Sequence, residues 1–390
     1  MAGKKARLLR VQLNPELLRW AIERAGYSLE NLKNKFPKIV AWERGEVQPT
    51  LKQLERLAKT LRVPLGFLFL DHPPTELLPI PDFRTAGWVK HSRPTSELLD
   101  TIYICQQAQE WYRDYLVSTG EKPLPFVASA TIDDDPYEVA AEIRERLGFN
   151  IGQRRALPTW TQALSGFIEQ VENIGIVVMV NGVVGNNTHR PLDPSEFRGF
   201  ALVDTWAPLV FVNGADTISA KTFTLAHELS HIWLGKSGVT DSELFRLPDD
   251  PVERWCNQVA AEILVPQESL EQYYNPHDDI HVEMNRLARV FKVSTLVVLR
   301  RLFDAGHLDW NTYKETYNRE RDRLLSYERK QAKGGGDFYA TLRRRVSPRL
   351  AQALAASVYE GHTLFRDALR MLGISKIETF KRFVQNLRRP

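Results

Sequence analysis

The chain has 390 residues, of which 43% are hydrophobic and 26% charged, as is ordinary for a soluble globular protein of two to four domains. No apolar run approaches the roughly 18 residues needed to span a bilayer, which argues against a membrane protein. The N-terminus lacks an apolar stretch behind Lys4 and Lys5, and the only cysteines are Cys105 and Cys256. We therefore expect no signal peptide, no disulfide framework and a cytoplasmic location.

The net charge of +4 conceals an uneven distribution along the chain. Residues 1–72 carry a net +7 and residues 311–390 a net +10, whereas residues 73–310 carry −13. This pattern indicates that nucleic acid or an acidic partner contacts the ends of the chain rather than its middle. Solvated helices in domains that neutralise one another would give the same numbers, so both interpretations stay open.

Residues 1–75 are predicted to form a small helical domain. Asn14 is a good N-cap because Pro15 follows it at the first helical position, and Gly26 ends that helix. Ser28 is expected to cap a second helix that runs to about Lys35. In all, the pattern predicts four or five short helices between residues 14 and 70.

Residues 76–150 are predicted to form a linker followed by a layer of helices. The segment 71–84 is rich in proline and should be extended. Helices are expected at 95–118 and 134–148, and Gly148 is a stop signal for the second of them. We expect both helices to pack beside the domain that follows.

Residues 151–275 are predicted to form a mixed core. A helix is expected from Thr159 to about Asn173, followed by three strands at 175–180, 197–203 and 208–212. The strands would form a sheet that supports the next helix. Because an edge strand can bind an extended peptide by strand addition, residues 208–213 are a candidate substrate edge.

The next helix, which should end at Gly235, contains the sequence His227-Glu228-Leu229-Ser230-His231. Two histidines four residues apart lie on one helix face, so both rings can reach one metal ion. Glu228 lies about 100° around the helix and can take a proton from a metal-bound water. A chance occurrence of the pattern in a long helix is the alternative.

The following helix, expected at 251–265, offers a third metal ligand, since catalytic zinc usually has three protein ligands. Glu253 and Glu262 are nine residues apart and so lie on opposite faces. Glu253 lies within the apolar arc, where a carboxylate is costly unless it is paired or coordinated, whereas Glu262 lies at the polar margin. We therefore predict Glu253 as the third ligand, with Asn257 one turn on as a group that supports a ligand. A salt bridge between the two helices is the alternative role for Glu253.

The remaining residues are predicted to be mostly helical. Within residues 276–330, two consecutive helices resemble a second helix-turn-helix, although ordinary bundle packing gives the same pattern. Within residues 331–390, a flexible break at Gly334-Gly335-Gly336 precedes basic amphipathic helices, with Gly373 as a stop signal.

Roughly residues 170–270 resemble the ImmA/IrrE family of zinc metallopeptidases. The similar runs are 208–213, 221–231, 253–257 and 260–266. The resemblance implies that His227, His231 and Glu253 bind Zn²⁺ and that Glu228 is the catalytic base. It also implies that the substrate is a protein partner, such as a transcriptional repressor or an antitoxin.

The N-terminal region resembles the Xre/Cro class of helix-turn-helix, through Trp42-Glu43-Arg44-Gly45 and the run 48–58. The resemblance implies DNA binding by the second helix of the motif. However, Leu32 and Trp42 are only ten residues apart, and Pro37 interrupts the segment that should hold the base-reading side chains. A protein-docking or degenerate module is therefore favoured over sequence-specific DNA binding.

These observations predict an α+β, multi-domain protein with a minimal gluzincin-like zincin core flanked by helical modules. The leading hypothesis is a zinc-dependent endopeptidase that cuts a specific protein partner. One alternative is a DNA-binding transcriptional regulator whose zinc is structural, and the other is an antitoxin-like partner-binding protein of a toxin–antitoxin or mobile-element system. Glu228 favours the endopeptidase, because a structural site needs no base.

Overall fold

The computed structural model describes residues 10–74, 78–82, 94–240, 250–328 and 338–387. They divide into two compact units, one within residues 1–78 and 92–99 and the other within residues 79–91 and 100–390. The finer boundaries predicted at residues 150, 275 and 330 stay predictions. Among the described residues, no helix is both long and apolar enough to cross a membrane.

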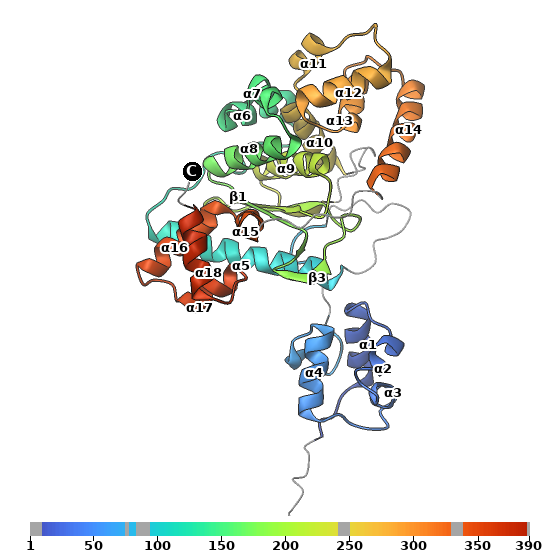
Figure 1. Cartoon of the computed structure of the whole chain (residues 1–390), viewed down its shortest axis with the longest axis vertical. Coiled ribbons are helices and arrows are strands. Elements are labelled where there is room, and N and C mark those ends of the chain that lie inside the picture. The colour runs from blue at the N-terminus through green and yellow to red at the C-terminus, as the bar shows by residue number, and fades with distance from the viewer. Residues whose placement is uncertain (1–9, 75–77, 83–93, 241–249, 329–337, 388–390) are drawn as a thin grey trace, which may run out of the picture. The chain divides into compact units, whose positions relative to one another are not determined.

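The N-terminal unit consists of short helices, as predicted (Figure 1). They are α1 (Pro15–Arg24), α2 (Leu29–Lys33), α3 (Ile39–Glu43), α4 (Leu51–Leu61) and the 3₁₀ helix η1 (Leu65–Phe69). Asn14 caps α1 and Ser28 caps α2, each through its side chain. The second helix ends two residues earlier than predicted, and Pro37 lies in the turn before α3. Each helix turns an apolar face inward around the buried Trp42.

The second unit is built around a four-stranded sheet with the order β1-β5-β4-β6. β1 (Val177–Asn181) pairs in parallel with β5 (Leu209–Asn213), and the other pairs, with β4 (Gly199–Leu202) and β6 (Gly238–Thr240), are antiparallel. A separate hairpin joins β2 (Val183–Val184) to β3 (Asn187–Pro191). The three predicted strands are confirmed as β1, β4 and β5, whereas β2, β3 and β6 were not predicted.

The prediction that residues 208–213 form a substrate-binding edge is wrong. These residues form β5, which pairs with β1 on one side and with β4 on the other, so both of its backbone edges are occupied. The outer edge of β6 is also partly covered. The Val239 backbone N–H donates to the Pro81 carbonyl at 3.0 Å, and Asp82 forms a parallel bridge with Val239.

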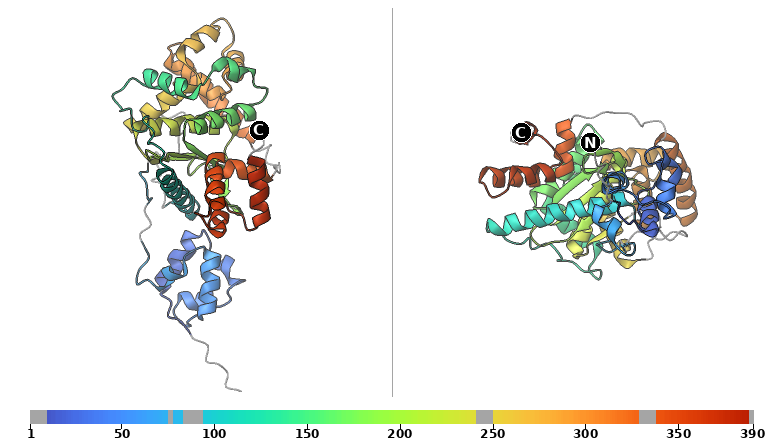
Figure 2. Two further views of the ribbon diagram at one scale, coloured as in Figure 1. Left: turned by 90° about the vertical axis from the view of Figure 1, so that its left-hand side faces the viewer. Right: turned by 90° about the horizontal axis from the view of Figure 1, so that it is seen from below.

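Helices cover both faces of the sheet (Figures 1 and 2). α8 (Trp160–Asn173) and α9 (Ile218–Leu234) lie on one face, and α5 (Ser96–Ser118) lies on the other with the C-terminal helices. Because side chains alternate along a strand, Val210 and Val212 of β5 face the α9 side while Phe211 faces the α5 side. The C-terminal helices are α15 (Phe338–Val346), α16 (Pro348–Tyr359), α17 (Phe365–Met371) and α18 (Ile377–Leu387).

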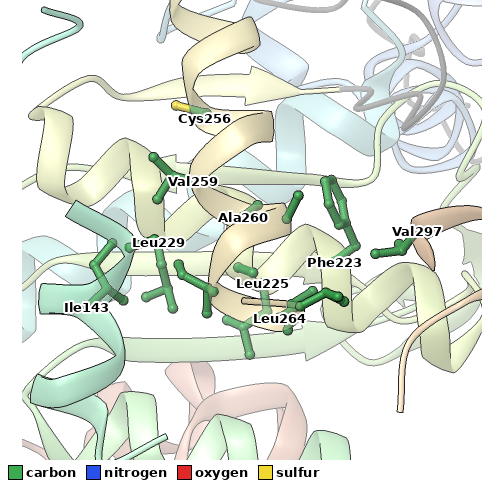
Figure 3. Close-up of a cluster of buried hydrophobic side chains, with 14 of the residues drawn as sticks. Ile143, Phe223, Leu225, Leu229, Cys256, Val259, Ala260, Leu264 and Val297 are labelled. Carbon is green, nitrogen blue, oxygen red and sulfur yellow. The ribbon is translucent and has the colours of Figure 1, made fainter. Parts of the chain in front are cut away.

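A second helical layer packs on α9. Figure 3 shows Leu229 of α9 beside Ile143 of α6 (Pro136–Leu147) and Val259 of α10 (Pro251–Leu264). This core extends through four further helices: α7 (Ile151–Ala156), α11 (Gln267–Tyr273), α12 (Ile280–Phe291) and α13 (Thr295–Asp304). α14 (Trp310–Glu328) packs on α13. α12 and α13 are the two helices predicted to resemble a helix-turn-helix. Because they bury their apolar residues in this core, the pair contributes to bundle packing. The predicted break at 334–336 lies outside the described residues.

Candidate metal centre

Helix α9 places polar side chains inside the apolar core. Its start is fixed by Thr217, whose side chain accepts from the Ala220 N–H, and its end by Gly235, which adopts φ 70°. Every residue from Thr222 to Leu234 is buried, including His227, Glu228 and His231. Buried polar groups are costly without partners, so these three side chains must be compensated by neighbouring elements.

Helix α10 supplies a carboxylate to the two histidines. Asp250 caps this helix by accepting from the Val252 and Glu253 N–H groups, which fixes the first turn that carries Glu253. Glu253 Oε2 lies 3.2 Å from His227 Nε2, and Glu253 Oε1 lies 3.1 Å from His231 Nε2. The two Nε2 atoms are themselves 3.1 Å apart.

The three residues His227, His231 and Glu253 have the geometry of a metal-binding group. One candidate ligand atom from each lies within 4.8 Å of the others, and all three residues are buried. Two imidazoles and one carboxylate are a donor set typical of catalytic zinc, which keeps a further position for water. The chemistry and convergence of these donors fit a Zn²⁺ ion.

Glu253 and His227 shift each other's pKa. Burial alone would raise the pKa of Glu253, but the neighbouring His227 and His231 rings outweigh it and lower that pKa to about 2. Burial alone would lower the pKa of His227, but Glu253 raises it overall. Glu253 is therefore an ionised carboxylate at neutral pH, able to bind a positive charge.

Asn257 lies next to the histidines, one turn after Glu253. Its Oδ1 atom is 3.0 Å from His227 Nδ1. When the ring donates from Nδ1 to this amide oxygen, Nε2 keeps its lone pair for a metal ion. The structure thus brings together His227, His231, Glu253 and Asn257, the four residues proposed from sequence as ligands and ligand support.

Glu262 lies elsewhere on α10, in an ion-pair cluster. It pairs with Arg301 Nη2, and its Oε1 lies 3.5 Å from Arg144 Nη1. The expectation that Glu262 sits at a polar margin is wrong, because only 5% of this residue is exposed. The two arginines, which are distant in sequence, compensate a charge that the helix pattern assigned to solvent. Cys256 is a buried free thiol that packs among apolar side chains (Figure 3).

Glu228 is held against the sheet by β6. Its Oε1 atom accepts a hydrogen bond from the Thr240 hydroxyl, while its Oε2 atom is buried without a hydrogen-bond partner among the described residues. Burial raises the pKa of Glu228, and His231, His227 and Thr240 offset this only in part. One carboxylate oxygen is thus fixed and the other remains free to accept a proton.

Gly199 makes room for the Glu228 carboxylate. It pairs with Thr240 across the β4–β6 ladder. A Cβ atom at this position would lie 3.0 Å from Glu228 Oε1 and 2.5 Å from Thr224 Cγ2. Sequence reasoning missed both Gly199 and Thr240. The only available signal was a glycine inside a predicted strand, which can mark a close approach by another group.

The small mixed sheet, the His227-Glu228-x-x-His231 helix and the carboxylate from the next helix define a metallopeptidase-like core. Residues 171–303 match the family model of the IrrE N-terminal-like domain, Peptidase_M78. This match runs from the end of α8 through α13 and supports both the ImmA/IrrE resemblance and a peptidase activity in general. Residues 346–386 match a domain of unknown function, DUF8813, and the chain matches no curated protein.

Proposed function

We propose that the protein is a zinc-dependent endopeptidase that cuts a specific protein partner, such as a transcriptional repressor or an antitoxin. The observation that supports it most is the convergence of His227, His231 and Glu253 in the buried core, with Glu228 on the same helix as the histidines. Zinc held by these three side chains would polarise a scissile carbonyl and acidify a water molecule.

In this proposal Glu228 moves the proton. Its free Oε2 atom accepts a proton from the attacking water and later delivers it to the leaving amine. Thr240 keeps the other oxygen of the same carboxylate fixed, so the two oxygens have separate tasks. Asn257 holds the His227 ring in the tautomer that leaves Nε2 available.

The candidate metal centre lies inside the core, where His227, Glu228 and His231 are fully buried and Glu253 is 3% exposed. We propose that partner binding opens a path to these residues. Such opening would restrict the activity to a selected substrate and is consistent with a specific rather than a digestive peptidase.

The N-terminal unit is proposed to dock the partner rather than to read DNA bases. α3, which lies where the base-reading helix of the resembled motif would be, has only five residues. A helix of that length presents little more than one turn to a groove. A DNA-binding regulator and an antitoxin-like binding protein stay the alternatives.

A substrate trap tests the proposed function. Immobilised Glu228→Gln protein is incubated with host extract, bound proteins are identified by mass spectrometry, and each candidate is then incubated with zinc-loaded wild type. We expect at least one candidate to be bound by the variant and cut by the wild type. The His227→Ala variant is the control for loss of metal. A partner that the zinc-loaded wild type binds without cutting would contradict the endopeptidase and favour the antitoxin-like alternative.

A further inference from the structure

A cavity lies on the face of the sheet opposite α9, away from the candidate metal centre. Its volume is about 290 Å³, close to the lower end of the roughly 300–1,000 Å³ typical of small-molecule sites. Met179 of β1 and Phe211 of β5 line it on the sheet side, and Ile104 and Cys105 line it from α5. Residues of α15 and α17 and of the turn after α17 also line it, together with Asn181 and Gly185.

The lining of this cavity is apolar but contains cations without anions. Arg345 and Arg370 both contribute to it, whereas none of the lining residues that the structure describes is an aspartate or a glutamate. Arg345 lies in the last turn of α15, at the boundary of the segment that matches DUF8813. An excess of positive charge within an apolar cavity predicts a ligand that is apolar with an anionic end.

Arg345 is half-buried and differs from two fully buried arginines of the protein, Arg154 and Arg301. Arg154 donates to three backbone carbonyls, those of Phe291, Ala163 and Lys292, and Arg301 pairs with Glu262. By contrast, the Nε atom of Arg345 is buried and has no hydrogen-bond partner among the residues that the structure describes.

Burial also lowers the pKa of the Arg345 guanidinium, and no carboxylate among the described residues offsets this shift. A buried donor without an acceptor is costly, and each such group in a folded protein calls for an explanation.

We propose that this cavity binds a small monocarboxylate with an aliphatic or aromatic body, whose carboxylate accepts hydrogen bonds from Arg345. The apolar body would occupy the space between Met179, Phe211 and Ile104. The guanidinium presents its N–H groups in a planar fork that matches a carboxylate, and such charge-assisted bonds are the stronger kind. This site is on the opposite side of the sheet from His227 and His231 and does not depend on the proposed peptidase activity.

Calorimetric titration of the full chain tests the site. The probes are octanoate for a straight-chain body, 1-naphthoate for an aromatic body and octanol as an uncharged control. We expect saturable binding of at least one acid at one molecule per chain. Which acid binds more tightly distinguishes an acyl ligand from an aromatic one. The Arg345→Met variant keeps the apolar stem without the charge and should bind the acid roughly 10- to 100-fold more weakly.

Three comparisons separate a binding role of Arg345 from a structural one. Arg345→Lys keeps the charge and should retain part of the affinity. Arg343→Met changes an exposed arginine of the same helix that does not line this cavity, and should bind as the wild type does. Octanol should bind equally weakly to wild type and Arg345→Met. Without ligand, the Tm of Arg345→Met should equal or exceed that of the wild type, because an unpaired buried donor has been removed.

The proposal is overturned if neither acid binds at millimolar concentration, or if Arg345→Met binds the acid as tightly as the wild type. A marked fall in the Tm of ligand-free Arg345→Met would assign Arg345 a structural role and would equally overturn it.

Discussion

The two glutamates of α10 should separate metal binding from stability. Glu253→Gln removes a carboxylate from the proposed zinc ligands, whereas Glu262→Gln removes the charge that compensates Arg301 and Arg144. We expect the Glu262 variant to hold about one zinc per chain and to unfold at a lower temperature. The Glu253 variant should lose zinc on dialysis against a weak chelator.

The size of the stability effect follows from the burial of the Glu262 cluster. Arg301 is 3% exposed, so its charge loses its compensating anion in a buried position when the carboxylate is neutralised, although it keeps its hydrogen bond to the Val265 carbonyl and its place over the Tyr137 ring. Breaking one partner of a buried pair costs about 3–5 kcal/mol. Burial raises the pKa of Glu262, and Arg301 and Arg144 offset this only in part. The ionised form of Glu262 is therefore not fully compensated, and we expect a loss of stability at the lower end of this range. Because one kcal/mol shifts Tm by about 2–4 °C in domains of about 150–250 residues, Tm should fall by several degrees.

Zinc per chain is measured by elemental mass spectrometry, and unfolding is followed in the presence of chelator so that metal binding does not contribute. Arg301→Met is a useful companion variant, since it should also leave zinc content unchanged. Equal zinc loss from the Glu253 and Glu262 variants would refute the assignment of opposite helix faces.

Four further predictions concern other parts of the chain. Glu228→Gln should reduce the rate of partner cleavage by about 10²–10⁴, with zinc content and Tm nearly unchanged, as measured by mass spectrometry of the fragments. Thr240→Val removes the hydroxyl that donates to Glu228 Oε1 and should lower kcat without loss of zinc. Thr240→Ser keeps a hydroxyl and should have a kcat close to that of the wild type. Equal kcat in the wild type and both variants would contradict a positioning role for Thr240.

Burial raises the pKa of Glu172 to about 7, in spite of its hydrogen bond from Ser347, so its contribution to stability is complete below about pH 4.5 and is lost as pH rises through 7. Glu172→Gln should therefore gain stability over the wild type between pH 5 and pH 8, by up to about 3 kcal/mol in denaturant unfolding, and parallel profiles would contradict this. Residues 1–75 should bind DNA weakly, with an affinity that falls steeply with salt; a nanomolar, sequence-selective footprint at physiological salt would contradict this expectation.

Helix boundaries were the part of the fold that the sequence predicted best. α6 begins at Pro136 after the cap Asp135 and ends before Gly148, and α8 begins after the cap Thr159. Caps act within one helical turn, so the residues that determine a boundary are adjacent to it in the chain. The same local reasoning placed His227, His231 and Glu253 on facing helix surfaces, because helical spacing alone sets which side chains share a face.

Features that depend on distant pairing were not predictable in this way. β6 has only three residues and no alternating pattern, and its pairing with β4 is what brings Thr240 to Glu228. The central position of β5 follows from its direct parallel pairing with β1, although β4 comes between the two strands in the chain, and no local signal encodes this pairing. The burial of Glu262 likewise required arginines far along the chain.

The bridge between Pro81 and Val239 has a consequence for any shortened form of the protein. A chain cut to begin after residue 82 would leave the Val239 N–H without the Pro81 carbonyl and would expose the outer edge of β6 to other strands. The next residue along this strand is Thr240, whose hydroxyl holds Glu228. Fraying of so short a strand would therefore both promote self-association and loosen the proposed base. An isolated peptidase core should retain the connector at 79–82 if it is to keep its solubility and its active geometry.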